Sequence, residues 1–121
     1  MNPTDLELLE QFVTLGNQAA FEQLVARHQA MVEGVCRRIL TGTVECDDAV
    51  QATFVALARS GSRLTRRWGA GDSLASWLHR VATNAALQLR RQDAARRRSE
   101  LAFVEQQAHV RTQSQGQQNQ W

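Results

Sequence analysis

The sequence predicts an all-α domain, a compact bundle of about four helices followed by a disordered, glutamine-rich C-terminal tail. Three observations support this fold class. The 121-residue chain contains a single proline, Pro3, and no run in which β-branched and polar residues alternate. Its apolar residues recur at the three- and four-residue spacing of a helix face. Its hydrophobic content of 43% suffices for one core. We therefore expect one helical domain over residues 1–104 and a disordered tail or truncated linker over residues 105–121.

The first helix is expected to begin at Thr4 or Asp5. Thr4 and Glu7 fit a capping box, in which each side chain accepts a hydrogen bond from the backbone of the other residue. The pair Gly16–Asn17 is expected to end this helix, because glycine readily adopts the left-handed conformation after a last helical turn. The apolar positions of this helix are Leu6, Leu9, Phe12 and Val13.

The second helix is expected to begin at about Gln18, with Asn17 as its N-cap. It carries the longest apolar stripe of the chain, which consists of Phe21, Leu24, Val25, His28, Val32, Val35 and Ile39. The segment Thr41–Gly42–Thr43 is expected to end it. Because His28 lies on this stripe, we interpret it as a packed histidine.

The third helix is expected to begin between Glu45 and Asp48, because carboxylates favour a helix N-terminus. It should run to about Arg59. A loop containing three glycines is expected from Ser60 to Asp72, and the fourth helix over residues 73–98. One face of the fourth helix is apolar and carries Leu74, Trp77, Leu78, Val81, Ala85 and Leu89. The opposite face carries Ser76, Arg80, Thr83, Asn84, Leu87 and Arg91.

These stripes predict a core between the third and fourth helices, completed by the second helix. The predicted core residues are Val50, Phe54, Leu74, Trp77, Leu78 and Val81, with Val25, Val32 and Ile39.

The charge of the chain is unevenly distributed. All 14 basic residues are arginines, and the formal net charge is +2. Residues 1–58 hold eight acidic residues and three arginines, a net charge of −5, whereas residues 59–121 hold four acidic residues and eleven arginines, a net charge of +7. Such asymmetry indicates that the basic half contacts nucleic acid or a membrane. The exclusive use of arginine is equally consistent with a GC-rich genome.

The outer face of the third helix carries a carboxylate, an amide and small apolar groups. Asp48, Gln51, Ala52 and Val55 fall on one side of the helix, opposite its core residues. Such a patch suits a partner protein that offers arginine and a shallow apolar groove. An ordinary helix start, with acidic residues placed for the helix dipole, explains the same pattern.

A second candidate surface joins the expected loop to the polar face of the fourth helix. Arginines attract phosphates, and an exposed tryptophan can stack on an unpaired base. The alternative is a solvated connector in which Trp68 folds back onto the core. His79 also faces the basic side. The predicted single-strand-binding residues are Arg63, Arg66, Arg67, Trp68, Arg80, Asn84, Arg90 and Arg91.

No catalytic residues, cofactor or metal ligands are predicted. The chain lacks a glycine-rich phosphate loop, a nucleophile paired with histidine at a known spacing, and paired carboxylates outside a helix cap. Cys36 and Cys46 form no CxxC pair, and a zinc site would have to recruit His28 or His79 without recognisable spacing. No membrane span or signal peptide is recognised, so a cytoplasmic location is expected.

Three stretches, in this order, resemble region two of bacterial RNA polymerase sigma factors of the extracytoplasmic-function type. Residues 20–24, with Val32 and Val35, resemble the first conserved helix of that family. Residues 47–55 resemble its polymerase-binding helix, which has the pattern acidic-Asp-x-x-Gln-x-x-Phe. Residues 77–84 resemble its Trp-Leu-aromatic-Arg-Ile-Ala-x-Asn block.

The resemblance implies a transcription initiation factor domain with two partners. The face formed by Asp48, Gln51 and Val55 would dock on the clamp coiled-coil of core RNA polymerase. The basic surface would bind and melt the promoter minus-ten element and hold a flipped base of its non-template strand. The resemblance also makes an anti-sigma factor a candidate partner. The helix-turn-helix domain of the family has no counterpart, as expected for an excised, truncated or stand-alone region-two protein.

Two other classes of protein remain open. A helical nucleic-acid-binding module would bind DNA or RNA without needing the Asp48 face. A helical protein-interaction adaptor would show no salt-dependent binding of nucleic acid.

Overall fold

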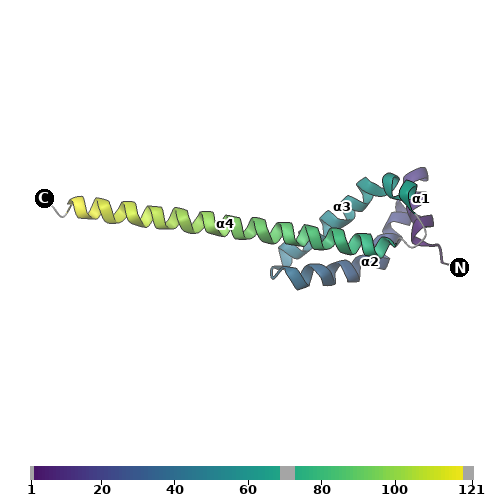
Figure 1. The fold of residues 1–121 in the computed structure, drawn as a ribbon, viewed down its shortest axis with the longest axis horizontal. Coiled ribbons are helices and arrows are strands. Elements are labelled where there is room, and N and C mark those ends of the chain that lie inside the picture. The colour runs from purple at the N-terminus through teal and green to yellow at the C-terminus, as the bar shows by residue number, and fades with distance from the viewer. Residues whose placement is uncertain (1, 69–72, 119–121) are drawn as a thin grey trace. The chain divides into compact units, whose positions relative to one another are not determined.

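The computed structural model describes the backbone of residues 2–68 and 73–118, and the side chains of residues 2–68 and 73–111. These residues form four helices: α1 (Asp5–Leu15), α2 (Gln18–Ile39), α3 (Thr43–Arg67) and α4 (Leu74–Gln118) (Figure 1). The all-α fold class is confirmed. The chain divides into two compact units, Met1–Leu89 and Arg90–Trp121, which are described separately.

The boundaries of the first two helices follow the local sequence signals. The backbone N–H of Glu7 donates to Thr4 Oγ1 at 3.1 Å, and that of Thr4 donates to Glu7 Oε2 at 3.3 Å, which completes the predicted capping box. Gly16 ends α1 in the left-handed conformation, with φ of 64°. The Asn17 side chain then accepts from the backbone N–H of Ala20 and caps α2.

The core of the first unit lies where the four helices meet. Its buried hydrophobic residues are Leu8, Leu9, Ala20, Leu24, Val32, Val35, Cys36, Leu40, Ala49, Phe54, Leu57, Leu74, Leu78, Ala82 and Ala86. Val25, Ile39, Val50 and Trp77, also predicted in the core, are partly buried and pack against it.

The prediction of Val81 in the core was wrong, because Val81 is only half-buried. The buried line of α4 instead repeats every four residues and consists of Leu74, Leu78, Ala82 and Ala86. The two alanines have no bulk that could mark them as core residues in the sequence.

The predicted loop over residues 60–72 was also wrong in its first part, because α3 continues to Arg67. Residues 69–72 lie outside the described residues. Gly61 resembled a helix breaker, but it is buried inside α3. A Cβ atom at Gly61 would lie 2.8 Å from Val13 Cγ2 and 3.4 Å from Leu9 Cδ1. Glycine is therefore required there by the contact between α3 and α1.

Asp5 joins the start of α1 to α2. Its Oδ2 atom lies 2.9 Å from His28 Nε2, and its Oδ1 atom accepts from Arg27 Nη1 at 3.2 Å. The His28 side chain is 12% exposed. The prediction of a packed histidine is thus confirmed, but the sequence did not reveal its carboxylate partner, which lies 23 residues earlier.

The second unit is helical from Arg90 to Gln118. Asp93 Oδ1 accepts from Arg96 at 2.8 Å, and Asp93 Oδ2 lies 3.2 Å from an Arg97 nitrogen. The side chains of residues 94–111 are exposed. The sequence predicted a disordered tail after residue 104, whereas the structure continues the helix to Gln118. A helix satisfies its own backbone groups, and glutamine is a good helix former, so the absence of a core did not decide the local conformation.

We expect Phe54→Ala to destabilise the first unit by roughly 3–5 kcal/mol, as for other buried phenylalanines. Phe54 is 7% exposed and belongs to the core, so the truncation removes apolar contacts and leaves a cavity. Urea unfolding monitored by circular dichroism would measure this change. A midpoint equal to that of the unchanged chain would contradict the assignment of this core.

Substitution of two helical glycines by alanine distinguishes the effect of packing on stability from the effect of helix propensity. Gly34→Ala should stabilise the domain by about 1 kcal/mol, because alanine is the better helix former and the nearest atom to its Cβ, Arg38 Nη2, is 3.7 Å away. Gly61→Ala gains the same propensity but forces its Cβ against Val13. Its free energy of unfolding should therefore be about 1–3 kcal/mol below that of Gly34→Ala. Equal stability of the two variants would show that α1 does not constrain α3.

Candidate nucleic-acid and protein interfaces

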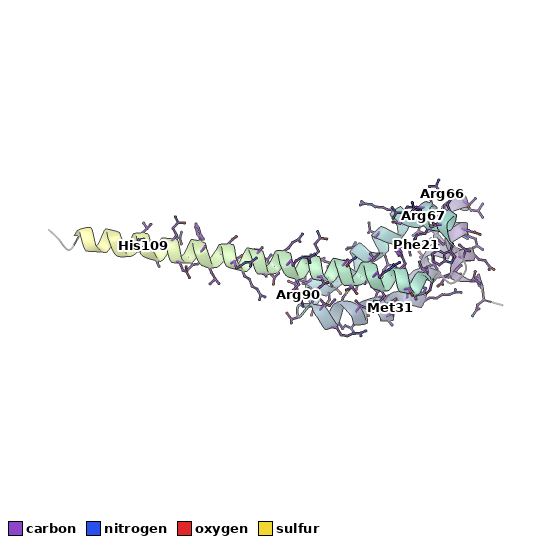
Figure 2. All side chains as sticks on the ribbon, viewed as in Figure 1. Phe21, Met31, Arg66, Arg67, Arg90 and His109 are labelled. Carbon is purple, nitrogen blue, oxygen red and sulfur yellow. The ribbon has the colours of Figure 1, made fainter. Side chains whose placement is uncertain are left out.

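A cavity of about 690 Å³ lies among α2, the end of α3 and the start of α4. It is lined by Met31, Leu64, Arg67, Trp68, Ser73, Ala75, Ser76, Trp77, His79 and Arg80. Met31 of α2 and Arg67 of α3 are labelled in Figure 2, on either side of α4 in that view. The volume of the cavity falls within the range of ligand pockets, about 300–1,000 Å³.

The cavity has an apolar wall that is continuous with the core. Met31, Leu64, Trp68 and Trp77 line the cavity and also pack against the buried cluster. Trp77, predicted as a core residue, therefore serves both the core and the cavity. Trp68 is half-buried, which fits the alternative in which this side chain folds back onto the core, and its remaining surface faces the cavity.

The polar rim of the cavity carries positive charge. Arg67 and Arg80 are exposed, and neither forms an ion pair with another described residue. Exposed His79 lies between Trp77 and Arg80 along α4. Cationic side chains beside aromatic rings can hold a phosphate and the face of an unpaired base together.

The start of α4 orients this rim. The Ser73 Oγ atom accepts from the backbone N–H of Ser76 at 3.3 Å, and the Ser73 carbonyl accepts from that of Trp77 at 3.2 Å. This cap fixes the first turn of α4, which supplies Trp77, and the next turn supplies Arg80. Asn84 is exposed one turn beyond Arg80.

The predicted nucleic-acid residues divide into four groups. Arg67, Trp68 and Arg80 line the cavity, and Asn84 follows on α4. Arg63 and Arg66 are exposed on α3 without lining the cavity. Arg90 and Arg91 belong to the second unit. The structure thus brings three of the eight predicted residues to one cavity.

The sequence did not predict the wall residues Met31, Leu64 and Ser73, whereas Ser76 lies on the predicted polar face of the fourth helix. Met31 lies 33 residues before Leu64 in the chain, so a local pattern could not connect the two. The net positive charge of residues 59–121 was the feature of the sequence that indicated the region of the cavity.

The outer face of α3 carries the second candidate site. Asp48, Gln51 and Val55 are all exposed, as predicted, and Val55 is 41% exposed. One turn before Asp48, Val44 is 69% exposed. Val44 was not predicted as part of this face, because the helix was expected to begin two to five residues later than it does.

The two cysteines are free thiols. Burial raises the pKa of the Cys36 thiol, and nearby Cys46 and Glu33 raise it further. Cys36 is therefore protonated and weakly nucleophilic at neutral pH. Within residues 2–68 and 73–111, no three histidine, cysteine or acidic side chains come together in a group that could hold a metal ion. None of the described helices combines the length and apolarity needed to cross a membrane.

Comparison with known proteins places this geometry in a family. Residues 24–97 match the family described as Sigma-70 region 2. The chain is 36% identical over 92 residues to the ECF RNA polymerase sigma factor SigM of Mycobacterium tuberculosis, covering 75% of this chain and 44% of that protein. It is 38% identical over 71 residues to the RNA polymerase sigma factor CarQ of Myxococcus xanthus, covering 59% of this chain and 38% of that protein.

A solved structure supports the same relationship. The NMR structure of an engineered region 2 of sigmaE in complex with GTAAAA matches with a TM-score of 0.65 and 28% sequence identity, over 79% of this chain and 97% of that one. The chain spans less than half the length of the curated relatives named above. Because the family match covers more than half of its residues, the chain belongs to the Sigma-70 region 2 family, of the type found in extracytoplasmic-function RNA polymerase sigma factors.

Proposed function

We propose that this domain acts in the cytoplasm as a non-enzymatic transcription initiation factor. It docks on the clamp coiled-coil of core RNA polymerase through Asp48, Gln51 and Val55. It then binds the non-template strand of the promoter minus-ten element with the cavity and its basic rim. The relatives are named as RNA polymerase sigma factors, which supports both parts of this proposal.

The proposed binding of DNA rests on the cavity. Trp68 and Trp77 offer aromatic faces, and Arg67 and Arg80 offer charges without ion-pair partners among the described residues. A base within a duplex cannot enter such a cavity, because its faces are stacked on neighbouring bases. A base that has left the stack can enter, while its phosphates remain beside the arginines. The similar sigmaE structure is a complex with the oligonucleotide GTAAAA, which supports this mode.

Asn84 and the remaining arginines extend the proposed DNA surface. An amide can donate to and accept from a base edge, and Asn84 lies on the same helix as Arg80, one turn further along. We assign phosphate contacts to Arg63, Arg66, Arg90 and Arg91.

The outer face of α3 supports the proposed docking on core polymerase. Its exposed carboxylate, amide and valine have no described partner within the chain. A partner helix could place a basic side chain against Asp48 and an apolar side chain against Val55.

For DNA, we expect weak binding of the isolated domain that falls steeply with added salt and favours single-stranded over duplex DNA of the same sequence. Arg80→Ala should weaken binding and reduce the slope of log K against log salt by about 0.7, the change for one phosphate contact with a single strand. Trp68→Ala should cost about 1–3 kcal/mol through lost stacking. Fluorescence anisotropy with a labelled minus-ten oligonucleotide would measure both effects.

Arg37→Ala is the matched control, because it removes one exposed arginine of α2 that already pairs with Glu33. It should leave the salt slope unchanged. Binding that is insensitive to salt, or that survives replacement of Arg80, Asn84 and Arg91 together by alanine, would rule this surface out. Salt-dependent binding of DNA by a chain that shows no affinity for core polymerase would instead favour a general nucleic-acid-binding module.

For polymerase, Asp48→Arg should weaken binding to the core enzyme by a few kcal/mol, the scale for opposing a charge in an interface. The exposed position of Asp48 means that the variant should fold normally, which its circular dichroism spectrum would verify. Pull-down and titration of core polymerase with both forms would test the expectation. Unchanged affinity of a folded Asp48→Arg variant would refute docking through this face.

A further inference from the structure

The helix of the second unit exposes a group of large apolar side chains. Leu101, Phe103, Val104 and Val110 are 62%, 59%, 59% and 55% exposed. They are four of the seven large hydrophobic side chains that are exposed within residues 2–68 and 73–111. At about 100° per residue, all four lie on one half of the helix, whereas Ala102 lies on the other half. An apolar side of this kind is stabilised when it packs against a second helix.

The charges of the second unit determine which direction of helix pairing is favourable. Residues 90–121 carry six arginines and three acidic residues, a net charge of +3. Three of these arginines, Arg96, Arg97 and Arg98, are consecutive and exposed. In a parallel pair of two copies, the two runs would lie against each other, and their like charges would repel. In an antiparallel pair the runs lie at opposite ends, so the charges of the unit favour the antiparallel arrangement.

One antiparallel register brings the apolar residues of two copies together. In this register, residue 102 of one copy lies level with residue 102 of the other, at the middle of the contact. The Leu101 side chains of the two copies then meet at one edge of the contact, and the two Phe103 side chains meet at the other edge. Val104 of each copy lies between these edges. The exposed apolar residues of each helix are therefore covered by the same residues of the other.

The same register places opposite charges at both ends of the contact. Arg111 of each copy lies opposite Asp93 of the other. Arg111 is exposed and forms no ion pair with a described residue. From residue 93 to residue 111 the contact is about 27 Å long, at 1.5 Å per residue. Apolar residues at the middle and opposite charges at the ends make a second copy complementary to this side of the helix.

We propose that the occupant of this apolar side is a second copy of the same chain, paired antiparallel through residues 93–111. A contact between two single helices of this length lies at the low end of protein interfaces, around 1,200 Å² or less. The association is therefore weak, reversible and dependent on concentration. It uses neither the Asp48 face nor the cavity, so it can fail without affecting the proposed function.

The test is sedimentation velocity of the full chain, treated with nuclease and measured over a wide range of concentration. The weight-average mass should rise with concentration from 13.6 kDa towards twice that value. Leu101→Asp should weaken the association about tenfold or more, because it removes an apolar contact and brings two carboxylates together. Ala102→Asp is the matched control, because it adds the same charge at the next exposed position, on the other half of the helix. It should associate at least as strongly as the unchanged chain, since it lowers the net positive charge of the unit.

Three outcomes would overturn self-association through this side. The first is a mass that stays at 13.6 kDa at every concentration. The second is equal weakening by Ala102→Asp, because any added negative charge would then be sufficient. The third is association that disappears after nuclease treatment, because nucleic acid bound to the arginines would then bridge the copies. Equal circular dichroism spectra of the two variants would exclude loss of helix as the cause of weaker association.

Disulfide cross-linking between two single variants tests the direction of the pair. In the proposed register, position 97 of one copy lies opposite position 107 of the other, about 15 Å along the helix from position 97 of that copy. A mixture of Arg97→Cys and Gln107→Cys should therefore form a mixed dimer, whereas neither variant alone should cross-link efficiently. The unchanged chain, with Cys36 and Cys46, gives the background. Cross-linking of each variant alone, without a mixed dimer, would indicate a parallel pair and overturn the antiparallel arrangement.

Discussion

The contact between α1 and α3 at Gly61 is the constraint on which the candidate sites depend. A Cβ atom at this position would collide with Val13, so the two helices approach as closely as they do only because glycine is present. The contact holds the last turns of α3 in place, and these turns supply Leu64, Arg67 and then Trp68 to the cavity. Glycine within a helix costs roughly 1 kcal/mol relative to alanine. The burial of Leu9 and the packing of Val13 offset that cost.

A single helix, α3, supports both proposed interfaces. Its inner side contributes Ala49, Phe54 and Leu57 to the core, so its outer side must face away from the core. Helical periodicity therefore separates the two surfaces without a second domain: the face formed by Asp48, Gln51 and Val55 lies along the outer side, and the cavity lies at the C-terminal end. Because both belong to one helix, a partner that binds this face also determines where the cavity is presented.

The sequence predicted those features that depend on neighbouring residues. The caps at Thr4, Gly16 and Asn17 were correct because they need only three or four consecutive residues. The exposure of Asp48 and Val55 followed from periodicity alone. Features that depend on distant residues were not predicted. In the sequence Gly61 resembled a loop signal, because its contact with Val13 of α1 is not local. Ala82 and Ala86 have no bulk that marks them as core residues. The cavity needs Met31, which lies far from Trp77 in the chain.

The first helix of the fold precedes the part of the chain that matches the family. The match begins at residue 24, yet Leu8, Leu9 and Ala20 are buried. A fragment trimmed to the matched residues would lose α1, which packs against Gly61, and would expose to water the apolar residues that α1 covers. Such a fragment should associate with itself through these exposed residues. The folded unit therefore begins with α1, whereas the family match begins inside α2.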